Sequence, residues 1–587
     1  MRIFNALLFS LTLAALPASP AVSGTPLQWH PWSQSIFEQA KRENRFVLLD
    51  LEAVWCHWCH VMEVTTYSDP AVMRLLQERY ILVRVDEDSR PDLANRYEDY
   101  GWPATVVFNY DGSEIIKRSG YLPPRQMASI LEAIIRDPSP GPSVRPESRL
   151  DFSHPLLLNP HLRDELTKDY LAKYDSEKGA WGFAQKYMDS SSEEYALTLA
   201  AAGDARAARM GKQTLLQAAR LLDPVWGGVY QYSTDGDWNA PHFEKIMLMQ
   251  AEYMRLYSIG YALWRDPQFL KTAEGIQGFL HNMLTSSEGA FYTSQDADLV
   301  DGVHSADYFK LNDAARRAKG IPRIDKHIYA RENGWAIYAL TTLYAAGADE
   351  EALRQATRAA NWIVSHRSLP GGGFRHDERD VAGPYLGDTL AMARAFLGLY
   401  SVTGDSQWLK RAQKAVDFIG ADFRDTEGAG FVTAKAATDR AYKPHAQRDE
   451  NIMLGRLANL LFHYTDNQVY RETAEQATKY VTSPEIAKVF PTAGALLLDR
   501  EMSTEPLHVT VVGSGNAVRK QLFQAALAYP STYRIIEVWD PREGPAPNHI
   551  QYPKLDKPAA FVCSNNRCSS PIFVADDLRS HVERFSR

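Results

Sequence analysis

Apolar and polar positions divide the sequence into regions with different patterns. Short apolar runs at 46–51, 81–85 and 104–108 predict buried strands, and a turn at 109–112 leads into a further strand at 114–117. A helical pattern at 126–136 follows, and then the proline-rich segment 138–142, which is typical of a linker. We therefore expect an α/β domain over residues 24–140.

From residue 150 to residue 500 the pattern changes to long helices that repeat. Residues 264–273 match residues 403–412, and each copy opens a new helix. Repeated helix–turn–helix units predict stacked helical hairpins, as an open solenoid or a closed ring. We favour an α/α ring, because its turns would bring Trp, Tyr, Asp, Glu and His together at one mouth. These glycine-rich turns, each with an aromatic residue, lie at 179–183, 227–230, 289–292, 371–374 and 428–431.

Residues 505–587 return to short elements. Strands at 508–512, 534–539 and 559–563 and one helix at 516–529 predict a small C-terminal α/β region. Cys563 and Cys568 flank a short loop in this region. They are a candidate structural disulfide, which we favour over a role as redox partner of the other two cysteines.

The N-terminus resembles an export signal. An apolar run at 3–16 ends at Pro17, and the small residues at 21–23 suit a signal peptidase. We expect residues 1–23 to be a signal peptide and the mature protein to be exported, which in a bacterium means the periplasm. No later stretch reaches the roughly 18 apolar residues of a membrane span, so no transmembrane segment is expected.

Composition narrows the choice of function. The chain has 587 residues, of which 45% are hydrophobic and 23% charged, as in a soluble protein of several domains. Its net charge is −8 and no basic run is concentrated anywhere, so nucleic acid is not an expected partner.

A Cys-x-x-Cys motif carries the clearest chemistry. Cys56 and Cys59 follow the strand at 46–51 and precede a helical segment, with Trp55 and His57 beside them. A helix N-terminus favours a thiolate, so the pKa of Cys56 is expected at about 3.5–7.5 instead of about 8.5. We expect an accessible Cys56 sulfur to attack and Cys59 to resolve the mixed disulfide.

Two other interpretations of this motif stay open. His57 and His60 with the two thiols could form a zinc site, although structural zinc sites usually take ligands from two separated clusters. The pair could also be an inert structural remnant. We favour redox chemistry and expect neither a metal nor a cofactor.

The loops of the helical region carry candidate pocket residues. Paired carboxylates hydrolyse glycosidic bonds, and His or Glu bases serve epimerisation. The alternative is that such residues are helix caps or solvated turns. The candidates are His242, Glu244, Lys245, Asp296, Asp298, Glu332 and Asp388.

These motifs together resemble a known family. They fall in the same order as in the spermatogenesis-associated thioredoxin-domain proteins and their bacterial relatives, over nearly the whole mature chain. The resemblance implies a thioredoxin-like domain fused to a six-hairpin glycosidase-like barrel, without a firmly established reaction. It also implies that Pro103 is the cis-proline that faces the dithiol. The matching segments are 55–62, 85–86, 90–92, 101–103, 241–245, 296–298, 332–335 and 563–571.

Three functions follow as hypotheses. The protein is an exported thiol–disulfide oxidoreductase whose barrel binds the client, or a glycosidase or sugar epimerase with an accessory thioredoxin domain, or a binding protein without turnover. The expected partners are accordingly substrate protein thiols or disulfides, or a carbohydrate.

Overall fold

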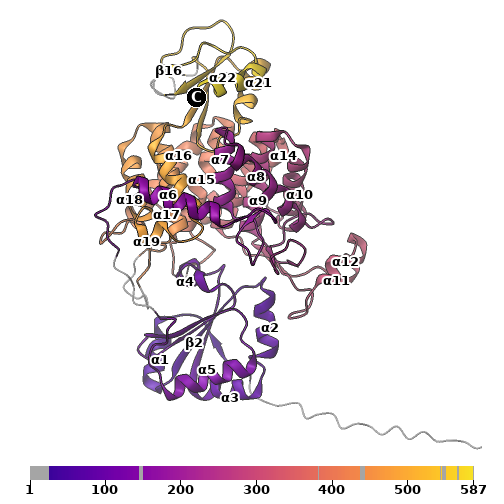
Figure 1. Cartoon of the computed structure of the whole chain (residues 1–587), viewed down its shortest axis with the longest axis vertical. Helices are drawn as coiled ribbons and strands as arrows, with labels where there is room; N and C mark the ends of the chain where they lie inside the picture. Colours follow the sequence, from indigo (N-terminus) through magenta and orange to yellow (C-terminus); the bar gives the residue numbers. More distant parts are fainter. Residues whose placement is uncertain are drawn as a thin grey trace, which may run out of the picture.

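The computed structural model describes residues 26–585 except 145–149, 381, 436–442, 543, 545–549 and 565–566. It stacks three units along its longest axis, with an α/β unit at one end, a ring of helices in the middle and a small C-terminal unit at the other end (Figure 1). The expected multidomain fold class is confirmed. The signal peptide expected at 1–23 lies outside the described residues.

The N-terminal unit is a five-stranded sheet with the order β1-β3-β2-β4-β5. The first three strands run parallel, and β4 and β5 run antiparallel to their neighbours. Apolar side chains from the two faces of the sheet pack into separate cores. The strands are β1 (Trp29–His30), β2 (Phe46–Glu52), β3 (Tyr80–Asp86), β4 (Ala104–Phe108) and β5 (Glu114–Ser119), and the helices are α1 (Gln34–Glu43), α2 (His57–Thr65), α3 (Pro70–Arg79), α4 (Pro91–Tyr97) and α5 (Pro124–Arg136).

The helical region is a closed ring, not an open solenoid. Six inner helices contact one another in chain order, and the last contacts the first. Each also pairs with an outer helix, which gives six hairpins among the described residues. The inner helices are α7 (Ser190–Ala201), α9 (Met247–Trp264), α13 (Ala330–Gly347), α15 (Leu386–Thr403), α17 (Arg448–Thr465) and α20 (Ala493–Ser503), and their outer partners are α8 (Ala205–Ala218), α10 (Pro267–Met283), α14 (Glu350–Arg367), α16 (Ser406–Asp422), α18 (Gln468–Val481) and α6 (Pro160–Ala172).

One hydrogen-bonding device recurs in four of the glycine-rich turns. The backbone N–H of Phe291 donates to Oδ1 of Asn333 on the next inner helix, 2.8 Å away. Phe431 and Asn451 repeat this geometry at 2.8 Å. Gln250 and Thr389 fill the same role for Val229 and Phe374. The repeat seen in the sequence therefore corresponds to a repeated hydrogen bond between a glycine-rich turn and an inner helix.

Shorter elements lie in the loops of the ring. They fix the turns at its mouth, next to the N-terminal unit. They are β6 (Tyr174–Asp175), β7 (Ala180–Trp181), β8 (Tyr232–Ser233), β9 (Pro241–His242), β10 (Lys245–Ile246), β11 (Ser294–Gln295), β12 (Ile324–Asp325), α11 (Ala306–Phe309), α12 (Asp313–Lys319) and α19 (Pro484–Ala487).

The C-terminal unit is a four-stranded sheet with the order β14-β13-β15-β16. It packs on the ring through β14, which contacts α15 and α17, and through α21, which contacts α13. Its second helix, α22, was not predicted from the sequence. No helix in the described part of the chain has both the length and the apolar character to cross a bilayer. The elements are β13 (Leu507–Val512), α21 (Ala517–Leu527), β14 (Arg534–Trp539), β15 (Ala559–Ser564), β16 (Arg567–Cys568) and α22 (Ala575–Phe585).

Candidate redox site and central cavity

The Cys-x-x-Cys motif lies at the start of α2, directly after the central strand β2. Cys56 is the N-cap of this helix, and its Sγ accepts a hydrogen bond from the Cys59 N–H at 3.1 Å. The two sulfurs form a disulfide with an S–S distance of 2.15 Å. The peptide bond between Trp102 and Pro103 is cis, and Trp102 packs against the cysteines. The motif therefore has the local geometry of a thioredoxin-type dithiol.

The expectation that the Cys56 sulfur is accessible was wrong. Cys56 is 3% exposed and Cys59 is 4% exposed. Trp55 and Trp102 pack beside them from the N-terminal unit, and Ile246, just before α9, packs on them from the ring. The loops at the mouth of the ring cover the start of α2, which a local sequence pattern does not reveal.

Two histidines of the motif bind one carboxylate of the ring. Nδ1 of His57 lies 2.8 Å from Oδ1 of Asp298, and Nδ1 of His60 lies 3.1 Å from Oδ2 of Asp298. Burial alone would raise the pKa of Asp298, but the hydrogen bonds from the two histidines lower it to about 2. The Ala297 N–H also donates to the Trp55 carbonyl at 3.3 Å. Asp298 is therefore a docking residue between the two units.

Glu244 of the ring also contacts the start of α2. Its Oε1 accepts a hydrogen bond from the His57 N–H at 3.3 Å, and burial raises its pKa to about 7. Its Oε2 is buried without a hydrogen-bond partner among the described residues. His242 stacks on Tyr232 with ring centres 4.4 Å apart, and burial lowers the pKa of His242 to about 4.

Asp296 is a further residue of the contact between the ring and the N-terminal unit. Burial raises its pKa to about 6, and Arg323 binds it at 3.2 Å while also donating to the Val54 carbonyl at 2.6 Å. His60, Asp296 and Asp301 place possible ligand atoms within 4.8 Å of one another, but Arg323 already lies 3.3 Å from Nε2 of His60. The zinc alternative drawn from the sequence needs thiolates, whereas both sulfurs of this motif form the disulfide.

The Lys245 side chain points away from the dithiol helix and into the wall of the ring. Its ammonium lies inside the ring wall, 2.7 Å from Asp223, and 4.3 Å from the centre of the Phe279 ring. Arg316 binds Asp223 as well, at 2.7 Å. Burial lowers the pKa of Lys245 to about 8. These contacts make Lys245 part of a buried ion-pair network.

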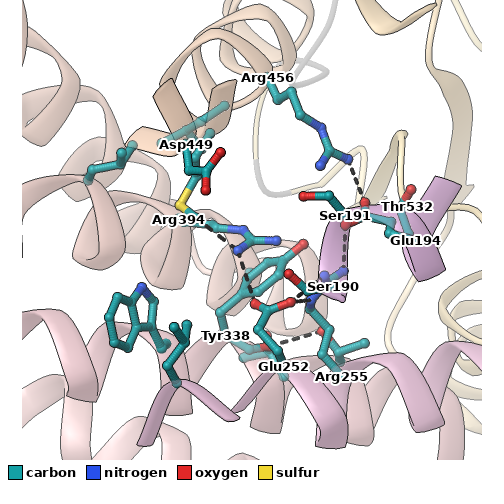
Figure 2. Close-up of a pocket in the computed structure, with 18 of the residues that line it drawn as sticks. Ser190, Ser191, Glu194, Glu252, Arg255, Tyr338, Arg394, Asp449, Arg456 and Thr532 are labelled. Atoms are coloured by element: carbon teal, nitrogen blue, oxygen red, sulfur yellow. Dashed lines mark hydrogen bonds and ion pairs between the residues drawn. The ribbon is translucent and has the colours of Figure 1, made fainter. Parts of the chain in front are cut away.

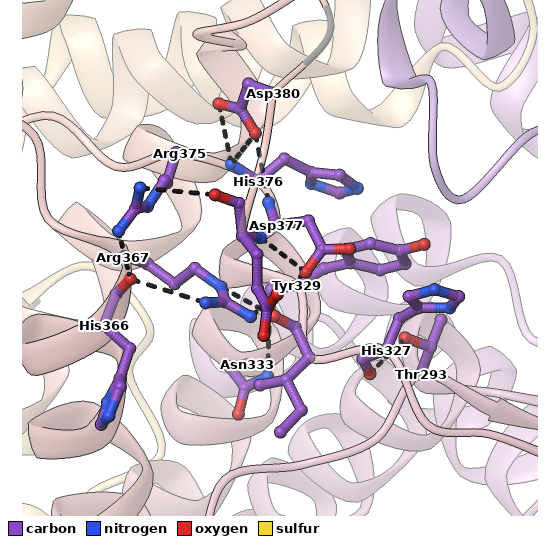
Figure 3. A network of polar contacts seen from close by, with 12 residues as sticks. Thr293, His327, Tyr329, Asn333, His366, Arg367, Arg375, His376, Asp377 and Asp380 are labelled. Carbon is purple, nitrogen blue, oxygen red and sulfur yellow. Dashed lines mark hydrogen bonds and ion pairs between the residues drawn. The ribbon is translucent and has the colours of Figure 1, made fainter.

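Asp388 belongs to a polar network around the loop after α14. Its Oδ1 lies 2.8 Å from Nδ1 of His376. The backbone N–H of His376 donates to Asp380, as Figure 3 shows. Nε2 of His376 reaches the Asp88 carbonyl of the N-terminal unit at 2.6 Å. Asp388 thus supports the contact between units and does not line the central cavity.

A cavity of about 560 Å³ runs through the ring. Trp55 and Trp102 line one end, and Tyr533 and Arg534 of the C-terminal unit line the other. Among the barrel-pocket candidates named from the sequence, Glu332 lines this cavity. Its middle holds a network of three acids and three arginines that the sequence analysis missed. Figure 2 labels all of them except Glu501. The available signal was a pair of charged residues in each of two otherwise largely apolar helices, Glu252 and Arg255 in α9 and Asp388 and Arg394 in α15. The network is Glu194, Glu252, Arg255, Arg394, Arg456 and Glu501.

Cys563 and Cys568 also form a disulfide, which links β15 to β16 with a Cα–Cα distance of 4.1 Å. It lies in the unit at the far end of the ring from the first pair (Figure 1).

Comparisons with known proteins agree with this architecture. Residues 19–136 match the family Thioredox_DsbH, described as "Protein of unknown function, DUF255". Human spermatogenesis-associated protein 20 is 22% identical over 547 residues, which covers 70% of this chain and 69% of the human protein. The thiol:disulfide interchange protein DsbD of Pseudomonas fluorescens is 33% identical over 84 residues, 14% of each chain.

Among solved structures, a sugar epimerase from a ruminal bacterium is similar with a TM-score of 0.43 and 13% identity, covering 55% of this chain and 85% of that chain. The resemblance to the spermatogenesis-associated family, expected from the sequence, is confirmed.

Proposed function

We propose that this protein is an exported thiol–disulfide oxidoreductase whose Cys56–Cys59 dithiol is covered by the helical ring in the docked state. The observation that carries the proposal is the disulfide itself, which lies at a helix N-terminus directly after the central strand β2. An exported location, inferred from residues 1–23, supplies an oxidising compartment where such a pair exchanges electrons.

The chemistry follows from the two sulfurs. A substrate thiolate attacks Sγ of Cys56, the Cys56–Cys59 bond breaks, and Cys59 leaves as a thiolate. A second substrate thiol then attacks the mixed disulfide and releases Cys56. Two electrons and two protons pass from the substrate dithiol to the protein pair. The reverse sequence reduces a substrate disulfide.

The backbone supports a Cys56 thiolate in the reduced state. The Cys59 N–H donates to Sγ of Cys56, and the positive end of the helix dipole lies at the same place. Because both cysteines are almost fully buried, a protein substrate requires the ring to move away from α2. The contacts of Asp298 and Glu244 hold the covered state, so the ring acts as an intramolecular cover for the dithiol.

Trapping of mixed disulfides tests this function. In the reduced Cys59→Ser variant, the Cys56 thiolate attacks oxidised glutathione, forms a mixed disulfide and expels one glutathione thiolate, which mass spectrometry detects. We expect the adduct to persist in Cys59→Ser and to be absent from Cys56→Ser. Equal modification of both variants, or of neither after reduction, would contradict the assignment.

A second candidate function rests on the cavity. Its volume of about 560 Å³ suits a small polar ligand, and its lining carries several carboxyl groups. A glycosidase or epimerase in the ring is therefore the alternative. Glu244 and Asp298 lie outside the lining, so Glu332→Gln is the appropriate inactive control in a screen of sugars. Turnover abolished by Glu332→Gln and retained in Cys56→Ser would favour the alternative.

A further inference from the structure

Charge is distributed unevenly along the central cavity. In its middle, the three acids and three arginines of the network form ion pairs with one another. At the end nearest the N-terminal unit, the lining includes Glu87, Asp88, Glu332 and Glu450, which we call the junction carboxyls. Arg331 is the only basic residue of the described lining at this end. The junction therefore has an excess of acid that the protein itself does not neutralise.

Contacts within this cluster leave oxygen atoms unused. Arg331 donates to Oε1 of Glu332 at 2.8 Å, and its guanidinium lies 3.8 Å from Asp88. Oε2 of Glu332 and Oε2 of Glu450 are buried and have no hydrogen-bond partner among the described residues. Glu332 is only 2% exposed. A buried acceptor without a partner is costly, which indicates that another group satisfies it.

The backbone makes room for this arrangement. Gly387 lies in the first turn of α15, and a Cβ added there would meet Oε1 of Glu450 at 2.9 Å. Burial raises the pKa of both Glu87 and Glu450 to about 8. Near neutral pH these two carboxyls therefore hold protons, and a bound cation would replace those protons as the counter-charge.

Aromatic faces complete the junction. Trp55 and Trp102 line the same end of the cavity as the junction carboxyls, and the Trp55 indole N–H donates to Oδ2 of Asp88 at 2.8 Å. Indole faces and carboxylates together are the groups that recognise an organic ammonium ion. A metal ion would instead require several carboxylates converging at short distances.

We propose that the junction carboxyls form a binding site for a small organic cation, such as a protonated primary amine, within the cavity between the N-terminal unit and the ring. This site does not depend on the redox activity proposed above. It is built by two units at once, since Glu87 and Asp88 follow β3 while Glu332 and Glu450 lie in the first turns of α13 and α17.

A second cavity adjoins the central one beside the site. It has a volume of about 410 Å³ and shares Asn95, Glu98, Gln447 and Asp449 with the central one. Asp449 is exposed, and Nε2 of Gln447 donates to Glu98 at 3.0 Å across the shared opening. We expect a ligand of the proposed size to enter at these shared residues.

Two matched pairs of probes test the cation site by titration calorimetry near pH 7 at low salt. One pair is glucosamine and glucose, and the other is 1,5-diaminopentane and 1,5-pentanediol, so each pair compares ammonium with hydroxyl. We expect the cationic member of at least one pair to bind about tenfold or more tightly than its neutral partner, because a charge-assisted hydrogen bond is about twice as strong as a neutral one. Glu332→Gln and, separately, Glu450→Gln should remove most of that preference.

The control variant is Glu472→Gln, which removes the same charge from an exposed position on the outer helix α18. It should leave binding unchanged. Circular dichroism establishes that each variant is folded, and the two isosteric junction variants serve as independent tests. Equal binding of both members of each pair, no binding of either cation, or a preference that survives both junction variants would overturn the proposal.

Discussion

The carboxylate of Asp298 in the helical ring lies 2.8 Å from Nδ1 of His57, the residue that follows the first redox cysteine. The same carboxylate binds His60 at 3.1 Å. One acid from a loop of the ring thus holds two consecutive turns of the dithiol helix. Because these contacts join a carboxylate to two imidazoles, the covering of Cys56 by the ring should depend on the ionisation of Asp298 and of the histidines.

Replacing Asp298 should uncover the dithiol. In Asp298→Asn the charge that binds both histidines is lost, and we expect docking to weaken by roughly 1–3 kcal/mol. The reduced cysteines should then react faster with an alkylating reagent at fixed pH. Asp307→Asn removes an exposed charge from nearby α11 and should leave the rate unchanged. An unaltered rate in Asp298→Asn would show that this contact does not hold the cover.

Docking should be tightest near pH 4–5 and weaken toward pH 8. The pKa of Asp298 is lowered to about 2, so its contribution is present above pH 3.8 and lost as pH falls toward 2. Burial raises the pKa of Glu244 to about 7, so its contribution is complete below pH 4.5 and lost as pH rises through 7. Burial alone would lower the pKa of His60, but the hydrogen bond to Asp298 and the charges of Asp296 and Asp298 raise it. The contribution of His60 to docking is therefore also lost as the pH rises.

Thermal unfolding midpoints between pH 4 and pH 8 measure this dependence. Glu244→Gln cannot ionise, so its midpoint should fall less over this interval than that of the unmodified protein. Identical profiles would contradict the assignment of the alkaline loss to Glu244.

Glu244 should also raise the pKa of the reduced Cys56. Its Oε1 accepts a hydrogen bond from the His57 N–H at the start of the helix, where a Cys56 thiolate is stabilised. The pKa of Glu244 is about 7, so its charge repels that thiolate only in the fraction of molecules in which Glu244 is ionised. In Glu244→Gln we expect the Cys56 pKa to fall, as measured by ultraviolet absorbance of the thiolate during titration. Glu63→Gln, on an exposed position of α2, is the matched control. A rise, or no change, would contradict the prediction.

Replacing two adjacent acids of α7 by methionine should change the free energy of unfolding in opposite directions. Glu193 is fully buried, and neither of its carboxylate oxygens has a hydrogen-bond partner among the described residues. Burial raises its pKa well above its usual range. Glu193→Met should therefore increase the free energy of unfolding by about 1–3 kcal/mol.

Glu194 is the comparison, because it pairs with Arg255 at 2.9 Å and with Arg456 at 2.5 Å. Glu194→Met leaves three arginines with two acids in this network, so one buried positive charge lacks compensation, and the change should cost roughly 3–5 kcal/mol. Chemical denaturation of both variants measures the contrast. Destabilisation of similar size in both would contradict it.

Local patterns in the sequence predicted the elements well. The strand expected at 104–108 is observed as Ala104–Phe108, and the strand expected at 46–51 is one residue longer. The repeated turns marked the hairpins of the ring because the same backbone joint needs the same residue types. The disulfide geometry of Cys56 and Cys59 likewise follows from residues close in the chain.

Long-range docking was not predictable in the same way. His57 and Asp298 are 241 positions apart, and nothing in either local pattern indicates that they meet. The candidates His242, Glu244, Asp296 and Asp298 were expected in a barrel pocket, yet they contact or surround the dithiol helix. The charged lining of the cavity was missed because its residues come from five different helices, and no local pattern shows that they face the same cavity.

The reduction potential of the Cys56–Cys59 pair tests the central claim most directly. Equilibration of the full chain in glutathione or dithiothreitol buffers, followed by alkylation and mass spectrometry, gives its value. A reversible two-electron couple between about −270 and −120 mV, the range of thioredoxin-type proteins, is the predicted result. A pair that stays oxidised below about −300 mV, in the unmodified chain and in Asp298→Asn alike, would identify a structural disulfide and contradict the account.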